Sequence, residues 1–187
     1  GEEGVGVGLM ATATKPITGA DLAERIAAAV PDAVVEVTED AVLIAPEKLT
    51  EVAQFLHDDR DIDARFLNAL SGVDRYDYFE VVYHLSSLAH NHSLILKVRA
   101  DHDNPEVPSV VGVWQGANLQ EREAYDLLGI KFGGHPNLKR MLLWEGFPGH
   151  PLRKDFMSLQ AGLSPGLQRF PKEDPEKWGG EFRADKD

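Results

Sequence analysis

The sequence predicts an α+β fold, in which a few helices pack on a mixed or antiparallel sheet and a partly extended segment follows. Two patterns lead to this prediction: residues 49–56 repeat apolar side chains at helical spacing, and residues 79–88 and 94–98 are strand-like runs. The 187 residues include no cysteine, and a chain of this length can bury a core without a disulfide. We therefore expect one small domain of helices and a sheet over residues 16–116.

The other segments of the chain carry weaker signals of order. Residues 1–15 are rich in Gly, Ala and Thr without a periodic pattern, which is typical of a flexible tail. Residues 117–156 are charged, apolar and turn-rich at once, which favours a docking segment laid along another surface. Residues 157–187 contain repeated Pro and Gly breaks, so we expect an extended C-terminal tail.

The elements of the N-terminal half follow from capping residues and apolar spacing. Thr18 is a candidate N-cap for a helix that should stop at Pro31. Residues 34–37 and 42–45 are β-prone runs joined by a short polar stretch, which predicts a hairpin. The clear helix over residues 49–56 comes next, and a short strand over residues 66–70 should end at Ser71-Gly72.

Two strands and a linker should complete the domain. Residues 79–88 and 94–98 are joined by Ala89-His90-Asn91-His92, which indicates an antiparallel hairpin. Residues 101–108 contain two prolines and should form an exposed linker, because proline is disfavoured in helices and in central strands.

One more helix should open the docking segment. Asn118 followed by Glu121 is the pattern of a capping box, which predicts a helix from Leu119 to a stop at Gly129. Within this helix, Arg122 should face the acid one turn later, at Asp126, in the less favoured order of base before acid.

Charge and composition exclude several classes of function. The net charge of −12 and the pI near 5.0 argue against nucleic acid or anionic lipid as the main partner. Without cysteine the chain cannot ligate an iron–sulfur cluster through thiolates, and it has neither a GxGxxG motif nor a P-loop for a nucleotide. No apolar run reaches the length of a membrane span. Residues 131–154 are net basic on an otherwise acidic chain, which suits an acidic protein partner.

A stand-alone metallohydrolase is the alternative from another class. Its candidate ligands would be His84, His90, His92, Asp101, His102 and Asp103. No third ligand follows at a recognised spacing, and both groups fall in segments that should be exposed, so we expect no metal site. The acids of the docking segment could act in acid–base catalysis, but pairing with Arg122 explains them more simply. His135 and His150 each precede proline, which favours turn geometry over a proton relay or a quinone contact.

Four motifs in the docking segment carry a family resemblance. Residues 121–123 read ERE, residues 126–128 read DLL, residues 134–142 read GHPNLKRML and residues 149–156 read GHPLRKDF. In this order and spacing they resemble the signature of the 30 kDa subunit of respiratory complex I. In bacteria this is the C subunit of the proton-pumping NADH:quinone oxidoreductase, and the J subunit of chloroplasts and cyanobacteria is a relative. The resemblance is strong over residues 117–156 and extends more weakly back to about Thr18.

The resemblance implies a non-catalytic structural subunit of the peripheral arm, on the cytoplasmic face of a bacterial membrane. Its partners would be other complex I subunits, chiefly the 49 kDa subunit that forms much of the quinone pocket. FMN and iron–sulfur clusters would belong to partner subunits, with no cofactor and no catalytic residue in this chain. An equivalent subunit of a plastoquinone-reducing, coenzyme-dependent or hydrogenase-type complex is the alternative within this class.

The same motifs give the residues expected at the partner interface. We expect their charged, histidine and proline side chains there, with Arg153 pairing a partner carboxylate through its planar guanidinium. These residues are Glu121, Arg122, Glu123, Asp126, His135, Pro136, Lys139, Arg140, His150, Pro151, Arg153, Lys154 and Asp155.

Overall fold

The structure is a computed structural model that describes residues 14–158. Of the tails expected at residues 1–15 and 157–187, residues 1–13 and 159–187 lie outside the described part of the chain. The helices are α1 (Gly19–Ala29), α2 (Leu49–Asp58), α3 (Ala117–Leu128) and α4 (Lys154–Ser158), with a 3-10 turn, η1, at Pro46–Lys48. The strands are β1 (Lys15–Pro16), β2 (Val34–Val37), β3 (Ala41–Ile44), β4 (Phe66–Asp74), β5 (Tyr78–Ser87), β6 (His92–Asp101), β7 (Glu106–Pro108) and β8 (Lys131–Gly133). The predicted α+β fold is confirmed.

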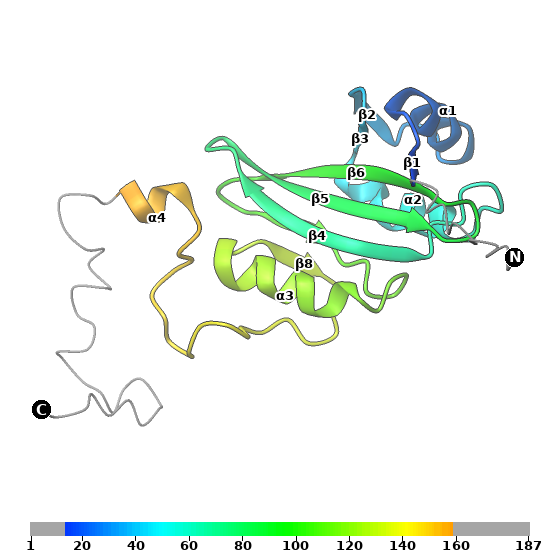
Figure 1. The fold of residues 1–187 in the computed structure, drawn as a ribbon. Coiled ribbons are helices and arrows are strands. Elements are labelled where there is room, and N and C mark those ends of the chain that lie inside the picture. The colour runs from blue at the N-terminus through cyan, green and yellow to red at the C-terminus, as the bar shows by residue number, and fades with distance from the viewer. Residues whose placement is uncertain (1–13, 159–187) are drawn as a thin grey trace, which may run out of the picture.

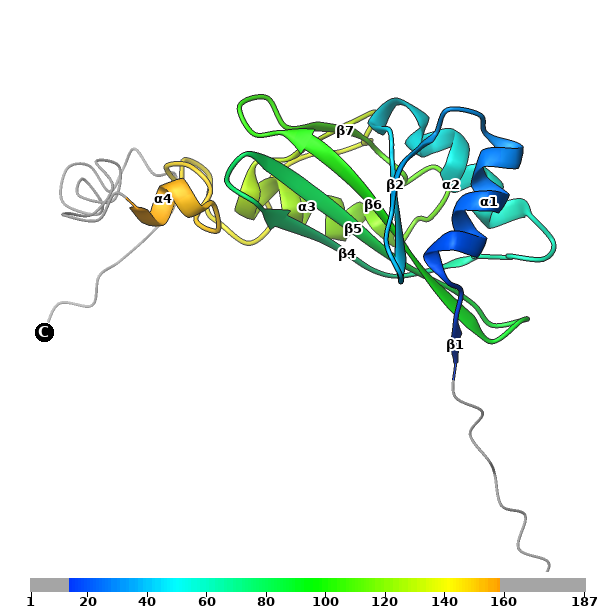
Figure 2. The same cartoon turned by 90° about the horizontal axis from the view of Figure 1, so that it is seen from above.

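The main sheet is mixed and has the strand order β2-β3-β6-β5-β4, with β1 also pairing with β6. Strands β4, β5 and β6 form an antiparallel meander, whereas β3 and β1 run parallel to β6. The two views in Figures 1 and 2 show the long β4–β6 strands with α3 beside β4 and with α1 and β2 toward the other edge. Strand β4 therefore forms one edge of the sheet, and β7 and β8 pair in a separate two-stranded sheet.

The core forms because apolar residues fall at the spacing of each element. The predicted stripe of α2 is buried throughout, from Leu49 to Leu56. Along β5 alternate residues such as Phe79, Val81 and Tyr83 are fully buried, as the two-residue period of a strand requires. The buried residues of α1, α2, α3 and the strands join one cluster, so a single core holds all three helices on the sheet.

Three of the sequence-predicted boundaries are wrong in detail. Strand β4 does not stop at Ser71-Gly72 but continues to Asp74, since it pairs with β5 along its whole length. The segment 101–108 is no exposed linker: it contains β7, whose Val107 is fully buried. Proline is tolerated there because β7 is a short strand at the edge of its sheet.

The expected N-terminal tail ends earlier than predicted. Lys15 belongs to β1, and its N–H donates to Asn91 O at 3.0 Å. The next pair follows at Ile17, whose N–H donates to Ser93 O at 2.8 Å. Tertiary pairing with β6, which no local pattern reveals, thus orders these residues.

Within residues 14–158, no helix is both long enough and apolar enough to cross a membrane.

Candidate docking surface

The segment after α3 is held on that helix by the carboxylate of Asp126, which is fully buried. Oδ1 accepts a hydrogen bond from Arg140 Nη1 at 3.0 Å. Oδ2 accepts the backbone N–H groups of Met141, Leu142 and Leu143 at 3.0, 2.8 and 2.9 Å. Burial by itself raises the pKa of this carboxyl, but the four donors outweigh burial and lower the pKa of Asp126. Asp126 is therefore an anion that fixes the following turn from inside.

Two arginines extend this anchor. Arg122 donates from Nε to Lys139 O at 3.0 Å and from Nη2 to Arg140 O at 3.2 Å. Arg140 donates from Nη2 to Gly149 O at 3.0 Å. The expected pairing of Arg122 with Asp126 is therefore wrong, because Asp126 turns inward to a partner fourteen residues later. Both arginines tie the segment to itself and to α3.

Glu121 also lies inside the chain, and the predicted capping box is wrong. The N-cap of α3 is Gly116 rather than Asn118. Glu121 is fully buried and accepts hydrogen bonds from Ser109 Oγ at 2.7 Å and from Val110 N at 2.8 Å. Burial raises the pKa of Glu121, and these two donors offset only part of that effect. This carboxyl thus joins α3 to the residues that follow β7.

The C-terminal end of α3 is closed by Gly129 and by two side chains from the segment. Gly129 has φ +78, and a Cβ there would lie 2.6 Å from His150 Cδ2 and 2.8 Å from Arg153 Nη2. His150 Nδ1 lies 2.9 Å from Asp126 O, and Arg153 Nε donates to Leu128 O at 2.6 Å. The last carbonyls of a helix have no partner within it, so these side chains cap α3. Arg153, which was expected to pair with a partner carboxylate, therefore contacts the end of α3 within this chain.

Both histidines of the GHP motifs are held by backbone groups. His135 Nε2 lies 3.1 Å from Asn118 O, and its Nδ1 accepts the N–H of Asn137 at 2.9 Å. Burial lowers the pKa of His150, and the charges of Arg140 and Arg153 lower it further, although the carbonyl contact raises it. The contact between Asn137 and His135 is local to a turn, whereas the contacts of His135 with Asn118 and of His150 with Asp126 join the segment to α3.

Helix α4 is fastened to the β4–β5 turn. Asp74, a buried residue at the end of β4, accepts the N–H of Lys154 at 2.9 Å and the N–H of Tyr76 at 2.8 Å. Burial raises the pKa of Asp74, but these donors and the nearby His102 outweigh burial and lower it. The Lys154 ammonium lies 3.9 Å from the centre of the Tyr76 ring, and the Arg153 guanidinium lies 5.0 Å from that of Phe79. The sequence contains no local signal for Asp74, because its contact lies eighty residues away.

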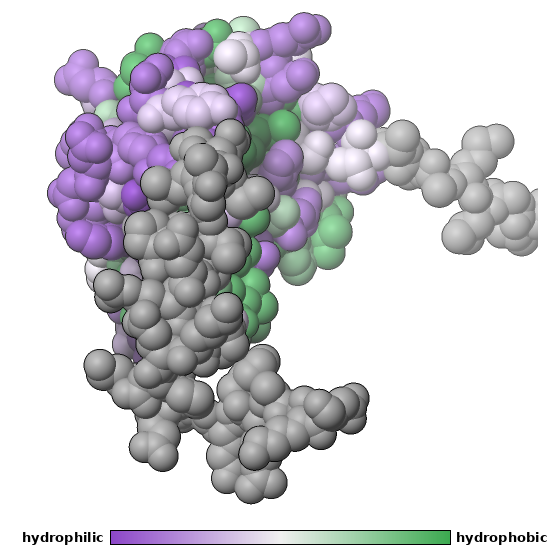
Figure 3. Space-filling view, turned by 90° about the vertical axis from the view of Figure 1, so that its left-hand side faces the viewer, coloured by the Kyte–Doolittle hydropathy of each residue, from purple (hydrophilic) through white to green (hydrophobic). Residues whose placement is uncertain are grey.

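The anchored segment leaves apolar side chains in solvent. Met141, Leu142, Trp144 and Leu152 are 39%, 56%, 37% and 59% exposed; we call these four residues the docking surface. Met141 and Leu142 follow the turn fixed by Asp126, and Leu152 N donates to a carbonyl of α3. Figure 3 shows exposed hydrophobic groups among hydrophilic ones on the side of the molecule that carries α4. The segment held by Asp126 thus presents apolar side chains that are 37–59% exposed in the described part of the chain.

The structure separates the residues expected at the interface into two groups. Glu121 and Asp126 are fully buried, and Arg122, His135, Arg140, His150, Pro151 and Arg153 are partly exposed. Glu123, Pro136, Lys139, Lys154 and Asp155 are exposed. The contacts described above show that most of the buried and partly exposed residues hold the segment in place from within the chain. The residues expected at the interface include none of the four residues of the docking surface, although the sequence shows the density of apolar residues in this segment.

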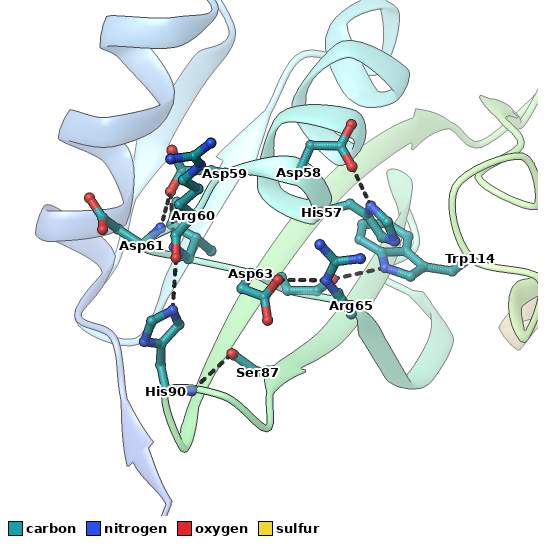
Figure 4. Close-up of polar contacts among 12 residues, drawn as sticks. His57, Asp58, Asp59, Arg60, Asp61, Asp63, Arg65, Ser87, His90 and Trp114 are labelled. Carbon is teal, nitrogen blue, oxygen red and sulfur yellow. Dashed lines mark hydrogen bonds and ion pairs between the residues drawn. The ribbon is translucent and has the colours of Figure 1, made fainter.

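Two of the four histidines considered as metal ligands contact backbone carbonyls. His90 Nε2 lies 2.8 Å from Arg60 O and His92 Nε2 lies 2.6 Å from Ile62 O. Figure 4 shows His90 turned toward the loop after α2, where Asp63 pairs with Arg65. His84 is exposed on β5. These contacts hold the β5–β6 turn against the loop, and they assemble no set of metal ligands there among the described residues.

A different group of acids and histidine lies close together beside α4. Ligand atoms of Asp74, His102 and Asp155 all lie within 4.8 Å of one another. Asp74 already accepts two backbone N–H groups, and the His102 ring stacks on Phe79 at 4.9 Å between centroids. The hydrogen bond from the N–H of Lys154 to Asp74 accounts for the position of Asp74 beside α4, and this contact needs no ion.

The chain is similar to one family of known proteins over more than half of its length. Residues 42–161 match the family described as "Respiratory-chain NADH dehydrogenase, 30 Kd subunit". The C subunit of the NADH-quinone oxidoreductase of Roseiflexus sp. (strain RS-1) is 47% identical over 146 residues, which are 74% of this chain and 84% of that protein. The same subunit of Roseiflexus castenholzii (strain DSM 13941 / HLO8) is 48% identical over 138 residues, or 70% of this chain and 79% of that protein.

A solved structure has the same fold. A chain of the membrane-bound sulfane sulfur reductase, an archaeal respiratory membrane complex, aligns with a TM-score of 0.60 at 20% identity, over 90% of this chain and 96% of that chain. At this identity the match supports the architecture alone.

Proposed function

Because the chain belongs to the family of the respiratory-chain NADH dehydrogenase 30 kDa subunit, we propose that it is a non-catalytic structural subunit of the peripheral arm of NADH-quinone oxidoreductase. Its partner is the subunit that forms much of the quinone pocket, and it reaches the membrane only through the complex, on the cytoplasmic face in a bacterium. The chain has no cysteine to hold an iron–sulfur cluster through thiolates. The redox centres of the reaction therefore belong to other subunits.

The observation that carries this proposal is the anchored docking surface. Three backbone N–H groups and Arg140 hold the turn on Asp126, so the exposed apolar side chains are already in place before a partner binds. A preorganised surface loses little conformational entropy on binding. Exposed Lys139 lies next to this turn, so partner carboxylates suit the rim. An apolar centre with a charged rim is typical of a protein interface.

The proposal is tested by placing a polar side chain on the docking surface. Leu142 is 56% exposed, so Leu142→Ser should leave the isolated fold intact and lower recovery of the tagged chain in the assembled complex by about tenfold. Leu88→Ser is the matched control, since Leu88 is 72% exposed in the turn between β5 and β6, away from α4 (Figure 1). Equal recovery of both variants would contradict the proposed surface.

The non-catalytic role has its own test. The purified chain should show no visible absorption, no bound flavin and no NADH oxidation, because its sequence offers no motif for a redox centre. A stoichiometric chromophore would overturn this part of the proposal.

The identity of the co-purifying subunits separates this complex from its relatives. The proposal requires an NADH-oxidising module in the complex recovered through this chain. Recovery of a plastoquinone-reducing, coenzyme-dependent or hydrogenase-type complex in its place would assign the chain to a related assembly with the same docking role.

A further inference from the structure

Strand β4 and helix α3 enclose a groove of about 370 Å³ that the contacts above do not fill. Its β4 wall is formed by small groups, among them Ala69, Ser71 and Gly72. Its helical wall includes Glu123 and Leu127. Leu152 of the docking surface lines the same groove, so the groove continues the surface that the proposed function assigns to the partner.

Among residues 14–158, no strand pairs with the outer side of β4. Strand β4 ends the strand order and pairs with β5 alone in its sheet. Exposed edges are usually protected from other chains by charged residues or proline. Strand β4 contains no proline, and its one charged residue, Asp74, is buried and accepts backbone N–H groups of this chain. Such an edge is a template for a further strand unless another part of the assembly covers it.

A side chain of α3 accepts a backbone hydrogen bond that a neighbouring strand would otherwise accept from β4. The N–H of Leu70 donates to Gln120 Oε1 on α3. Because backbone groups point to the same side at every second residue of a strand, Gly72 presents its N–H and C=O to this open side as well. A side-chain amide can rotate away when a backbone carbonyl competes for the same donor, so the edge can be re-paired.

The side of Gly72 that faces α3 is closely packed by this chain itself. A Cβ on Gly72 would lie 2.5 Å from Leu128 Cδ1, so glycine lets α3 pack tightly under β4. Glu123 is exposed on the opposite wall and makes no ion pair with another described residue. Its carboxylate is placed to meet a cation that enters with an extended chain.

We propose that this groove binds an extended, mainly apolar segment of the partner subunit, which adds a strand to β4 and sets a lysine or arginine against Glu123. This inference rests on the proposed function and names the form of the partner segment at that site. Backbone pairing along β4 supplies affinity, and the small β4 side chains and Glu123 select the segment.

Amide hydrogen exchange tests the added strand directly. The isolated chain is compared with the complex purified through a tag on this chain. We expect the Leu70 and Gly72 amides to exchange at least about tenfold more slowly in the complex. Unchanged exchange in a complex that does contain the chain overturns the added strand but leaves the proposed function standing. Absence of the chain from any respiratory complex overturns both.

The same measurement distinguishes other occupants. Protection that is present in the isolated monomer and lost when residues 159–187 are removed would mean that the chain fills its own groove. Protection that rises with the concentration of the isolated chain would mean a second copy. Either result overturns the proposal.

A charge reversal tests the predicted cation. Glu123→Lys should lower recovery in the complex about tenfold, because like charges then meet across the groove. Glu24→Lys on α1 is the matched control, with the same charge change on an exposed helical glutamate. If both variants assemble as the unchanged chain does, the predicted contact of Glu123 is wrong.

Discussion

At the scale of single residues, two buried carboxylates of α3 behave in opposite ways. Asp126 is surrounded by four donors, one of them a guanidinium, whereas Glu121 has only two neutral donors. Buried charge is stable where it is paired and hydrogen-bonded. On this one helix, the carboxyl of Asp126 is therefore held in its charged form, whereas the carboxyl of Glu121 is biased toward its neutral form.

The first prediction concerns Asp126→Asn. The amide loses the charge that Arg140 pairs with and weakens the hydrogen bonds of the turn, so we expect the free energy of unfolding to fall by about 2–4 kcal/mol. Denaturant titration of the isolated chain measures it. Glu123→Gln, on an exposed position of the same helix, is the control and should stay within about 0.5 kcal/mol. A loss no larger than that of the control would show that the anchor contributes little.

The second prediction concerns the pH dependence due to Glu121. Its folded-state pKa is raised by burial, so the stability it contributes is present below its unfolded pKa and is lost as pH rises through the folded pKa. Glu121→Gln keeps the shape and removes this titration; its amide oxygen can accept the N–H of Val110, and its amide nitrogen can donate to Ser109 Oγ in place of the bond that Glu121 accepts. The variant should therefore gain stability relative to the unchanged chain as pH rises from acid to neutral. Asp126→Asn should show the opposite trend, because the pKa of Asp126 is lowered. If the free energies of unfolding of Glu121→Gln and of the unchanged chain depended on pH in the same way, Glu121 would not be the source of this pH dependence.

At the scale of elements, the end of α3 decides where the docking segment lies. Gly129 leaves the helix in the left-handed conformation, and His150 and Arg153 occupy the space beside it. Leu152 then donates its N–H to Leu127 O at 3.0 Å. The helix terminus and the segment thus share one set of hydrogen bonds.

The third prediction is that Gly129→Ala both strains this terminus and displaces the segment. Alanine at φ +78 is unfavourable, and its Cβ would be 2.6 Å from His150, so we expect a loss of about 1–3 kcal/mol. Gly116→Ala at the other end of α3 is the control: Gly116 has φ −60, and an added Cβ would meet no atom within 4 Å. Thermal unfolding of both variants measures the difference. Equal melting temperatures would refute the steric role of Gly129.

At the scale of the whole molecule, β1 joins the N-terminal end of the described chain to the centre of the sheet. Lys15 and Ile17 hydrogen-bond to Asn91 and Ser93 around the start of β6, and Ile17 packs against the core. Pairing at this position links the first described residues to the β5–β6 hairpin.

The fourth prediction concerns truncation. Removing residues 1–13, which show no apolar periodicity, should leave the melting temperature nearly unchanged. Removing residues 1–17 should lower it by several degrees, since about 1 kcal/mol of lost pairing and burial shifts the midpoint of a chain of this size by roughly 2–4 °C. Calorimetry of the two truncated chains compares them, and an equal shift would mean that β1 adds no stability.

The sequence by itself determined the fold class, the main helices and the meander, because these follow from local periodicity: apolar residues from Leu49 to Leu56 repeat at helical spacing, and every second residue of β5 from Phe79 to Ser87 is buried. It also determined the family, because the motifs of residues 121–156 lie close together in one stretch. Only the tertiary structure decided what the charged motif residues do. Asp126 meets Met141 fifteen residues later, and Asp74 meets Lys154 eighty residues later. Local spacing carries no information about such contacts, because they depend on which elements the core brings together. A charged residue read as facing solvent or a partner therefore proved, at Glu121, Asp126 and Arg153, to be part of the chain's own framework.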